Sequence, residues 1–279
     1  MTSAPTTTDH HDVVPRKPGW SLSLIPAAFI SLSAFFLFAL EIRPLGYFTM
    51  AVGIGLCVWL DKVLLRDLLL VAVGLIIVST ISVRADVSWG NVLLMGTVLT
   101  MAVAVPYLIN RYGYGDHTIR FHWLSGKWTT WMWAYLFAVP VIGWVILPTY
   151  FVRSGAYRNW PELADWTEIA RFFAGVNFVG SWDEFFFIIT IFVLLRRHFS
   201  FWFANVLTAV IFVSFLWELG YKEWGPLLTT PFAILQAYLY SKTRSLLYVL
   251  IVHLLFDVVV FLSIVHVRYP ELKIFFYLW

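Results

Sequence analysis

The sequence predicts an all-α fold, a polytopic transmembrane helical bundle of eight to nine spans with additional interfacial helices. Of the 279 residues, 61% are hydrophobic and only 13% are charged, whereas a soluble domain is about 25% charged. The mean hydropathy is +0.80, and the apolar residues form long runs separated by short polar stretches. Such runs predict helices, because a helix satisfies its backbone polar groups within its own segment of the bilayer. A water-soluble globular protein is therefore excluded.

The apolar runs divide the chain into successive spans, each of which needs about 20 mostly apolar residues. The expected spans lie at 21–41, 45–60, 67–83, 88–109, 129–152, 172–195, 199–217, 226–241 and 245–266. Several runs are short, so eight spans is the alternative to nine. Residues 1–20 are polar and predict a disordered N-terminal tail, and residues 267–279 form a C-terminal tail. Between the tails we expect N-terminal helices with amphipathic connections (21–171) and a C-terminal core (172–266).

Two connections between the spans are longer and amphipathic. Residues 111–128 mix charged with aromatic side chains, as segments that lie in the membrane interface do. Residues 157–171 predict a short surface helix, with Pro161 suited to its first turn. Most of the 15 Trp and 13 Tyr residues fall near the ends of spans, where aromatic rings anchor a protein at the level of the headgroups.

Charge and cysteine content exclude several other classes of protein. The net charge of +3 comes from 19 basic and 16 acidic residues that are spread thinly, which argues against a nucleic-acid partner. The single Cys57 excludes a disulfide framework and a cysteine-based metal site. With nine spans, 11 of the 19 Lys and Arg residues fall on the N-terminal side. The positive-inside rule then predicts a cytoplasmic N-terminus, and we expect a multi-pass protein of a bacterial plasma membrane.

Five ionisable residues lie inside the expected spans and are the candidate catalytic residues. Such groups cost several kcal/mol in lipid and indicate a functional site. They are Asp183, Glu184, Glu218, His253 and Asp257. The helical rise of about 1.5 Å per residue places four of them in one slab of the membrane, with Glu218 approaching from the opposite interface. We therefore expect all five to share one pocket.

The adjacent acids Asp183 and Glu184 need compensation, because two neighbouring carboxylates in lipid repel each other and lose their solvation. At least one of them must be protonated, paired or bound to a metal ion. All five candidate residues are also of types that ligate metals, and a carboxylate-rich set with one histidine suits a divalent ion such as Mn, Fe or Zn. A metal site formed by the same five residues is thus an alternative, and no other cofactor is indicated.

The C-terminal third, about residues 172–266, resembles the CPBP (CAAX protease and bacteriocin-processing) family of intramembrane endopeptidases, also called the ABI family. The family's first motif, Glu-Glu-x-x-x-Arg, corresponds to Asp183-Glu184-Phe185-Phe186-Phe187-Ile188, with a shorter first acid and no Arg. Its second motif, Phe-x-x-x-His, corresponds best to residues 214–218, with Glu218 in the place of the histidine. Its third motif, His-x-x-x-Asn or Asp, is intact as His253 and Asp257.

The resemblance implies a peptide-hydrolysing site. Asp183 or Glu184 would be the general base that activates water, and His253 with Asp257 would be the oxyanion or orienting pair. The implied partners are membrane lipids and a peptide or prenylated protein substrate, or a membrane protein partner. Two other functions stay open: a metal-dependent membrane enzyme that acts on a lipid or isoprenoid, and a non-catalytic relative whose cavity binds a lipid or peptide.

Overall fold

The fold is described by a computed structural model over residues 21–124 and 126–275. The expected tail at residues 1–20 and the last four residues of the expected C-terminal tail lie outside the described residues. Every regular element within the described part of the chain is a helix. The all-α class is therefore confirmed.

Nine helical segments follow one another in the described residues, and each overlaps one of the nine expected spans. They are α1 (Leu24–Ala34) with the π-helical η1 (Phe35–Ala39), α2 (Arg43–Leu60), α3 (Lys62–Val78), α4 (Trp89–Leu108) with η2 (Ile109–Gly113), α5 (Thr130–Ser154), α6 (Trp166–Asp183) with η4 (Glu184–Phe192) and α7 (Val193–Arg196), α8 (Phe201–Leu219), α9 (Pro226–Thr243) and α10 (Leu246–Arg268). Two short 3₁₀ turns, η3 (Ala156–Asn159) and η5 (Pro270–Leu272), complete the described elements.

Six of these segments are long and apolar enough to cross a membrane, fewer than the eight or nine expected. They are Arg43–Leu60, Trp89–Gly113, Thr130–Ser154, Trp166–Arg196, Phe201–Leu219 and Leu246–Arg268. The segment Leu24–Ala39 is apolar but shorter, and α3 has only 17 residues. Helix α9 is long enough, but it carries the polar Gln236 and Lys242 and an internal Pro231. The result is a helical membrane bundle in which α1, α3 and α9 are the less typical members.

The prediction of a surface helix over residues 157–171 is wrong. The chain makes the 3₁₀ turn η3, continues without a helix through Pro161, and begins α6 only at Trp166. The carboxylate of Asp165 accepts hydrogen bonds from the backbone N–H groups of Thr167 (2.8 Å) and Glu168 (2.9 Å). An N-cap of this kind is a stronger start signal than a proline four residues earlier. The Thr167 hydroxyl and these N–H groups hold the pKa of Asp165 below its usual value.

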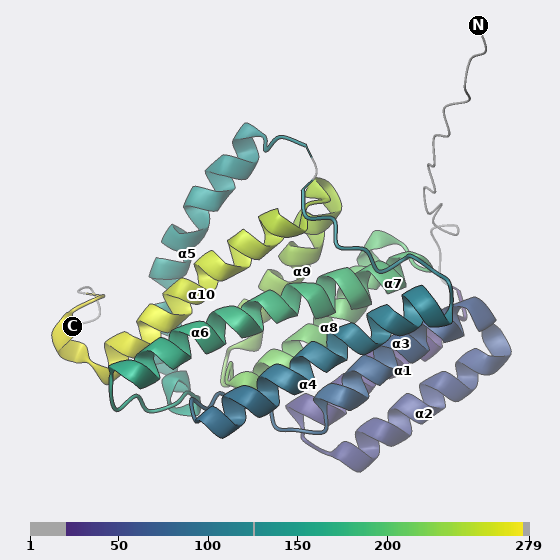
Figure 1. Ribbon diagram of the computed structural model, residues 1–279, viewed down its shortest axis with the longest axis horizontal. Helices are drawn as coiled ribbons and strands as arrows, with labels where there is room; N and C mark the ends of the chain where they lie inside the picture. Colours follow the sequence, from purple (N-terminus) through teal and green to yellow (C-terminus); the bar gives the residue numbers. More distant parts are fainter. Residues whose placement is uncertain (1–20, 125, 276–279) are drawn as a thin grey trace, which may run out of the picture.

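The helices are arranged around a centre formed by α6 with η4, α8 and α10 (Figure 1). Helix α5 packs against α10 at one edge of the molecule, and α2 packs against α1 and α3 at the opposite edge. Helix α6 contacts α10 on one side and α4 on the other, while α8 contacts α1, α9 and η4. Residues far apart in the chain thus meet where α6, η4 and α10 touch.

A cluster of aromatic rings fixes the rotation of α6 and η4 in this centre. Trp182 stacks on Phe186 with ring centroids 4.8 Å apart, and Phe187 stacks on Phe212 of α8 at 4.2 Å. The indole N–H of Trp182 donates to the backbone carbonyl of Leu99 at 2.7 Å, so the buried ring has its polar atom satisfied. The neighbouring residue Asp183 is consequently held in a defined direction.

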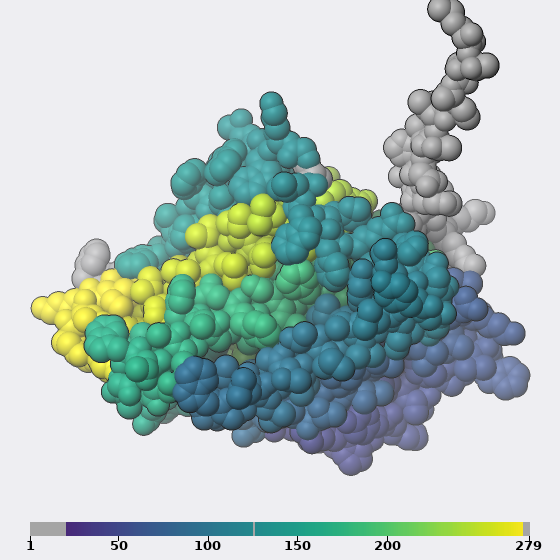
Figure 2. All heavy atoms as spheres, in the orientation of Figure 1, coloured from purple at the N-terminus to yellow at the C-terminus, as the bar shows by residue number. Residues whose placement is uncertain are grey.

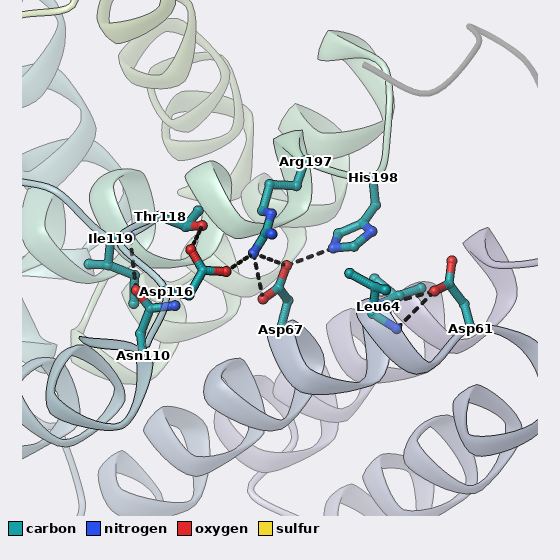
Figure 3. Close-up of polar contacts among 10 residues, drawn as sticks. Asp61, Leu64, Asp67, Asn110, Asp116, Thr118, Ile119, Arg197 and His198 are labelled. Atoms are coloured by element: carbon teal, nitrogen blue, oxygen red, sulfur yellow. Dashed lines mark hydrogen bonds and ion pairs between the residues drawn. The ribbon is translucent and has the colours of Figure 1, made fainter. Parts of the chain in front are cut away.

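A polar cluster that the sequence did not reveal lies where α3, the end of α7 and the 114–124 segment meet (Figure 3). The guanidinium of Arg197 donates to the carboxylates of Asp116 and, at 3.4 Å, Asp67. His198 Nε2 lies 2.6 Å from Asp67 Oδ2. Burial alone would raise the pKa of Asp116, but the hydroxyl of Thr118 and the charge of Arg197 lower it below its usual value. The cluster holds the 114–124 segment against the bundle.

Candidate functional site

The candidate site begins at the junction where α6 ends at Asp183 and the π-helix η4 begins at Glu184. Consecutive helical residues point about 100° apart, so the two acids face different neighbours. Asp183 lines a large cavity, while Glu184 is fully buried and faces α10. π-Helical turns inside α-helices are frequently found at functional sites, and the nine-residue η4 was not foreseen from the sequence.

His253 of α10 is at the centre of the acidic residues. Its Nδ1 lies 2.7 Å from Glu184 Oε1, a hydrogen bond between two buried side chains. Its Nε2 lies 3.7 Å from Asp183 Oδ2 and 3.9 Å from Asp257 Oδ1. The expectation that His253 and Asp257 converge, being four residues apart on one helix, is met in this geometry. Three of the other four candidate side chains therefore surround the His253 imidazole.

Three carboxylate oxygens of this cluster are buried without a hydrogen-bond partner in the described structure. They are Asp183 Oδ1, Glu184 Oε2 and Asp257 Oδ2. A buried polar atom without a partner costs free energy, so these oxygens call for a proton, a water molecule or a substrate group as their partner. The separations of 3.7 and 3.9 Å at Nε2 exceed hydrogen-bond length, so neither Asp183 nor Asp257 forms a direct hydrogen bond to Nε2.

Gly180 allows α6 and α10 to approach closely enough to form the cluster. A Cβ atom at this position would lie 1.8 Å from Asp257 Oδ2 and 3.3 Å from His253 Cδ2. Any larger residue would force the Asp257 carboxyl to move. This role could not be predicted, because a glycine in an apolar helix indicates only that some other helix packs closely against it.

The cluster lies at the wall of a cavity of about 620 Å³ between α4, α6 and α8. Asp183, His253 and Asp257 line it, whereas the walls between them and the rim are mostly apolar, with Val92, Met95, Phe172, Val176, Val179 and Leu216 among the lining residues. Helices α4 and α6 lie next to each other on the face of the molecule seen in Figure 2. The cavity therefore combines mostly apolar walls with polar groups at its inner end, a combination common in ligand-binding sites.

Tyr221 is a further lining residue, and no pattern in the sequence marked it as one. It follows α8 and lines the cavity together with the Asp183, His253 and Asp257 side chains. Burial raises the pKa of its phenol well above the usual value, and the nearby charge of Asp257 adds to the shift. The phenol keeps its proton at neutral pH, and it adds an O–H donor to a cavity that the carboxyl groups of Asp86, Asp183 and Asp257 also line.

The expectation that Glu218 shares the pocket is wrong. Its Oε1 accepts hydrogen bonds from the hydroxyl of Ser82 and the N–H of Val83, both at 3.2 Å. It lines a separate polar cavity of about 190 Å³ together with Glu41 and Arg43. The physical reason is the helical period: Leu216 and Leu219, three residues apart, face the large cavity, and Glu218 points away from that face.

This geometry also changes how the second motif is placed on the chain. A frame one residue later retains its phenylalanine as Phe215 and puts Leu219 at the position of the histidine. Leu219 lines the cavity. A histidine at this position of α8 would therefore face the site. The α8 side of the site is thus apolar, and His253 is the one imidazole among the lining residues of the described chain.

The metal alternative gains no support from the side-chain geometry. Over residues 21–124 and 126–275, no group of three or more His, Cys, Asp or Glu side chains is arranged to hold a metal ion. Asp183, Glu184, His253 and Asp257 are close together, but Glu184 is hydrogen-bonded to Nδ1 and the other two acids flank Nε2. Glu218, the fifth ligand of the alternative, lies at the other cavity.

Comparison with known proteins agrees with the family resemblance. Residues 165–259, a third of the chain, match the family model described as Rce1-like, type II CAAX prenyl endopeptidase Rce1-like. No curated protein and no solved structure matches the chain. The matched segment contains α6, η4, α8 and the part of α10 that carries the buried cluster. The match over residues 165–259 supports the resemblance of this C-terminal segment to the CPBP family, and the six apolar helices agree with an integral membrane protein.

Proposed function

We propose that the protein is an intramembrane endopeptidase of the CAAX type that hydrolyses a peptide bond near one membrane face. The observation that carries the proposal is the set of three carboxyl groups around His253 at the inner end of an apolar cavity. A membrane protease needs a place for water inside the bilayer, and a buried polar cluster next to an apolar substrate site offers one. The match of residues 165–259 supports the same chemistry.

In this proposal Asp183 is the general base and Glu184 orients the imidazole. Asp183 lines the cavity, and its carboxylate binds the water that attacks a carbonyl carbon on the cavity side of Asp183 and His253. Asp183 takes the proton as the C–O bond forms, and the tetrahedral oxyanion is stabilised by a donor on the opposite side. The C–N bond then breaks, the leaving amine takes the proton from Asp183, and the carboxylate is regenerated.

Donors for the oxyanion come from three residues in the proposal. Nδ1–H of His253 donates to the carboxylate of Glu184. When the ring is doubly protonated, its Nε2–H is free to donate to the oxyanion. A protonated Asp257 supplies an O–H, and so does Tyr221 at the cavity wall. Preorganised donors in a water-poor site stabilise an oxyanion far more than water does.

The substrate in this proposal is an apolar or prenylated peptide that enters from the lipid phase. The membrane orientation, with a cytoplasmic N-terminus and a location in a bacterial plasma membrane, belongs to the same proposal. It is supported by the excess of Lys and Arg on the N-terminal side.

The test compares isosteric variants of the full-length protein in lipid nanodiscs against a panel of prenylated and unprenylated fluorogenic peptides. We expect Asp183→Asn and Glu184→Gln to lower kcat by about 100-fold or more, because a general base contributes 10²–10⁴-fold. Glu218→Gln is the matched control, a buried acid at the other cavity, and it should retain activity within about threefold. Full activity in both Asp183→Asn and Glu184→Gln would refute the proposal.

The apolar α8 wall at Leu219 favours one second candidate, a non-catalytic relative that binds a peptide or lipid. Both candidates place the ligand in the cavity, but they differ in turnover. Saturable binding of the peptides without any cleavage by the unaltered protein would favour the binding protein over the enzyme.

A further inference from the structure

The rim of the 620 Å³ cavity carries one cation that the proposed chemistry does not use. Among the residues that line the cavity in the described chain, Arg171 is the only Lys or Arg. It lies in the second turn of α6, 12 residues before Asp183. At 1.5 Å per residue, the axial separation between them is about 18 Å. A ligand that spans the cavity therefore meets an acidic and imidazole cluster at one end and a guanidinium at the other.

Arg171 is held in place but keeps part of its donor capacity. Its Nε donates to the carbonyl of Val87 at 2.9 Å, and the guanidinium lies over the ring of Trp89, 5.1 Å from the centroid. The other two contacts are long: Nη1 to the hydroxyl of Thr167 at 3.4 Å and Nη2 to Glu168 at 3.6 Å. A guanidinium has five N–H donors, so at least two are left for a ligand.

Other charges at the rim modify this site without cancelling it. Asp86 also lines the cavity, but its carboxylate accepts a hydrogen bond from the N–H of Ser88 at 2.7 Å. The Oε2 atom of Glu168 accepts from the N–H of Ala164 at 2.7 Å. Arg171 is 18% exposed, so an anion bound there makes charge-assisted hydrogen bonds in a partly desolvated place.

We infer that Arg171 is a specificity-determining residue that binds an acidic group of the substrate. This inference rests on the proposed endopeptidase function. An extended peptide advances 3.3–3.6 Å per residue, so 18 Å corresponds to about five residues. The preferred substrate is an apolar peptide with a carboxylate, from an acidic side chain or a chain terminus, about five residues from the bond that is cleaved. The apolar walls between the two ends accept the intervening side chains.

The first test measures binding in the Asp183→Asn background, where turnover does not interfere. The probes are apolar peptides that carry a single Glu or, as the matched control, a single Gln, and the protein is the full chain in nanodiscs. We expect the Glu peptide to bind about tenfold more tightly, and Arg171→Gln to abolish this preference. Arg171→Lys, which keeps the charge, should retain most of the preference for the Glu peptide. Asp86→Asn should increase this preference, because it removes a negative charge from the same cavity.

The second test reads the spacing in the catalytically unaltered protein. Peptides with the Glu scanned along an apolar sequence are digested, and mass spectrometry locates the cleaved bond. We expect cleavage about five residues from the Glu, and loss of this register in Arg171→Gln through KM rather than kcat. Arg171-dependent binding without any cleavage would refute the proposed function but would still support the binding site at Arg171.

Two results would overturn the inference itself. One is equal binding of the Glu and Gln peptides, or a preference that survives Arg171→Gln. The other is an Arg171-dependent affinity for oleate, tested as a competitor, with no such dependence for any peptide. In that case the rim would bind an anionic lipid instead of a peptide.

Discussion

Gly180 provides the sharpest test of how closely α6 and α10 approach each other. In the Gly180→Ala variant the new Cβ would lie 1.8 Å from Asp257 Oδ2 and 2.9 Å from its Cγ. Since real side chains do not reach such distances, the Asp257 carboxyl must move away from His253. Forcing an extra carbon into a packed site costs about 1–3 kcal/mol.

Gly175→Ala is the matched control on the same helix. A Cβ at Gly175 has no heavy atom within 4 Å, so this variant gains only the helix propensity of alanine, about 0.5–1 kcal/mol. Both variants share that gain, and the difference between them therefore isolates the clash. A difference of about 1–3 kcal/mol corresponds to about 2–12 °C in Tm, at 2–4 °C per kcal/mol.

The assay is thermal unfolding of the two variants in the same nanodiscs, together with their peptidase activity. We predict that Gly180→Ala melts several degrees below Gly175→Ala and loses activity through the displaced Asp257. Equal melting temperatures, with activity retained in Gly180→Ala, would refute the close approach of α6 and α10 and the cluster that depends on it.

Three further predictions address other parts of the structure. The pKa of Asp116 lies below its usual value of 3.8, so its ionised form stabilises the fold above pH 3.8, and this stabilisation is lost as the pH falls through the lower, folded-state pKa. The Tm difference between the unaltered protein and Asp116→Asn should be present at pH 7 and shrink as the pH falls below 3.8, and a constant difference would contradict the assignment. Glu218→Leu removes the acceptor for Ser82 and Val83 and should lower the free energy of unfolding by about 1–3 kcal/mol, whereas Glu218→Gln keeps an acceptor and should lose less; equal losses in a chemical denaturation experiment would count against this role. Dialysis against EDTA should leave peptidase activity unchanged, because the acids near His253 are not arranged as a metal site; a loss that a divalent ion restores would instead support the metal alternative.

Much of the helical architecture could be predicted because lipid imposes strong constraints on a chain. Long apolar runs have to be helices in a bilayer, so the nine helical segments of the described residues overlap the nine expected ones. Length alone did not tell which of them are apolar enough to span, as the polar Gln236 and Lys242 of α9 illustrate. Helix α6 begins where Asp165 caps it. Pro161 is also a start signal in the sequence, and it wrongly favoured an earlier helix.

The candidate site was predictable in part for the same reason. Buried charges are rare in membranes, and this rule identified Asp183, Glu184, His253 and Asp257, which the structure brings together. It failed for Glu218, because depth along a helix does not give the direction of a side chain. Glu218 and Leu219 point about 100° apart around α8, and packing against neighbouring helices decides which of them faces the cavity. The role of Gly180 likewise depends on helix packing.

The coupling free energy between Glu184 and His253 measures whether these two residues share one buried site. It is obtained from the unfolding free energies of Glu184→Gln, His253→Ala, the double variant and the unaltered protein. The hydrogen bond of 2.7 Å between Nδ1 and Oε1 predicts a coupling of about 1.5–3 kcal/mol, the range for a bond to a charged group. A coupling indistinguishable from zero would contradict the account, since it would mean that the acid of η4 and the histidine of α10 do not share one buried site.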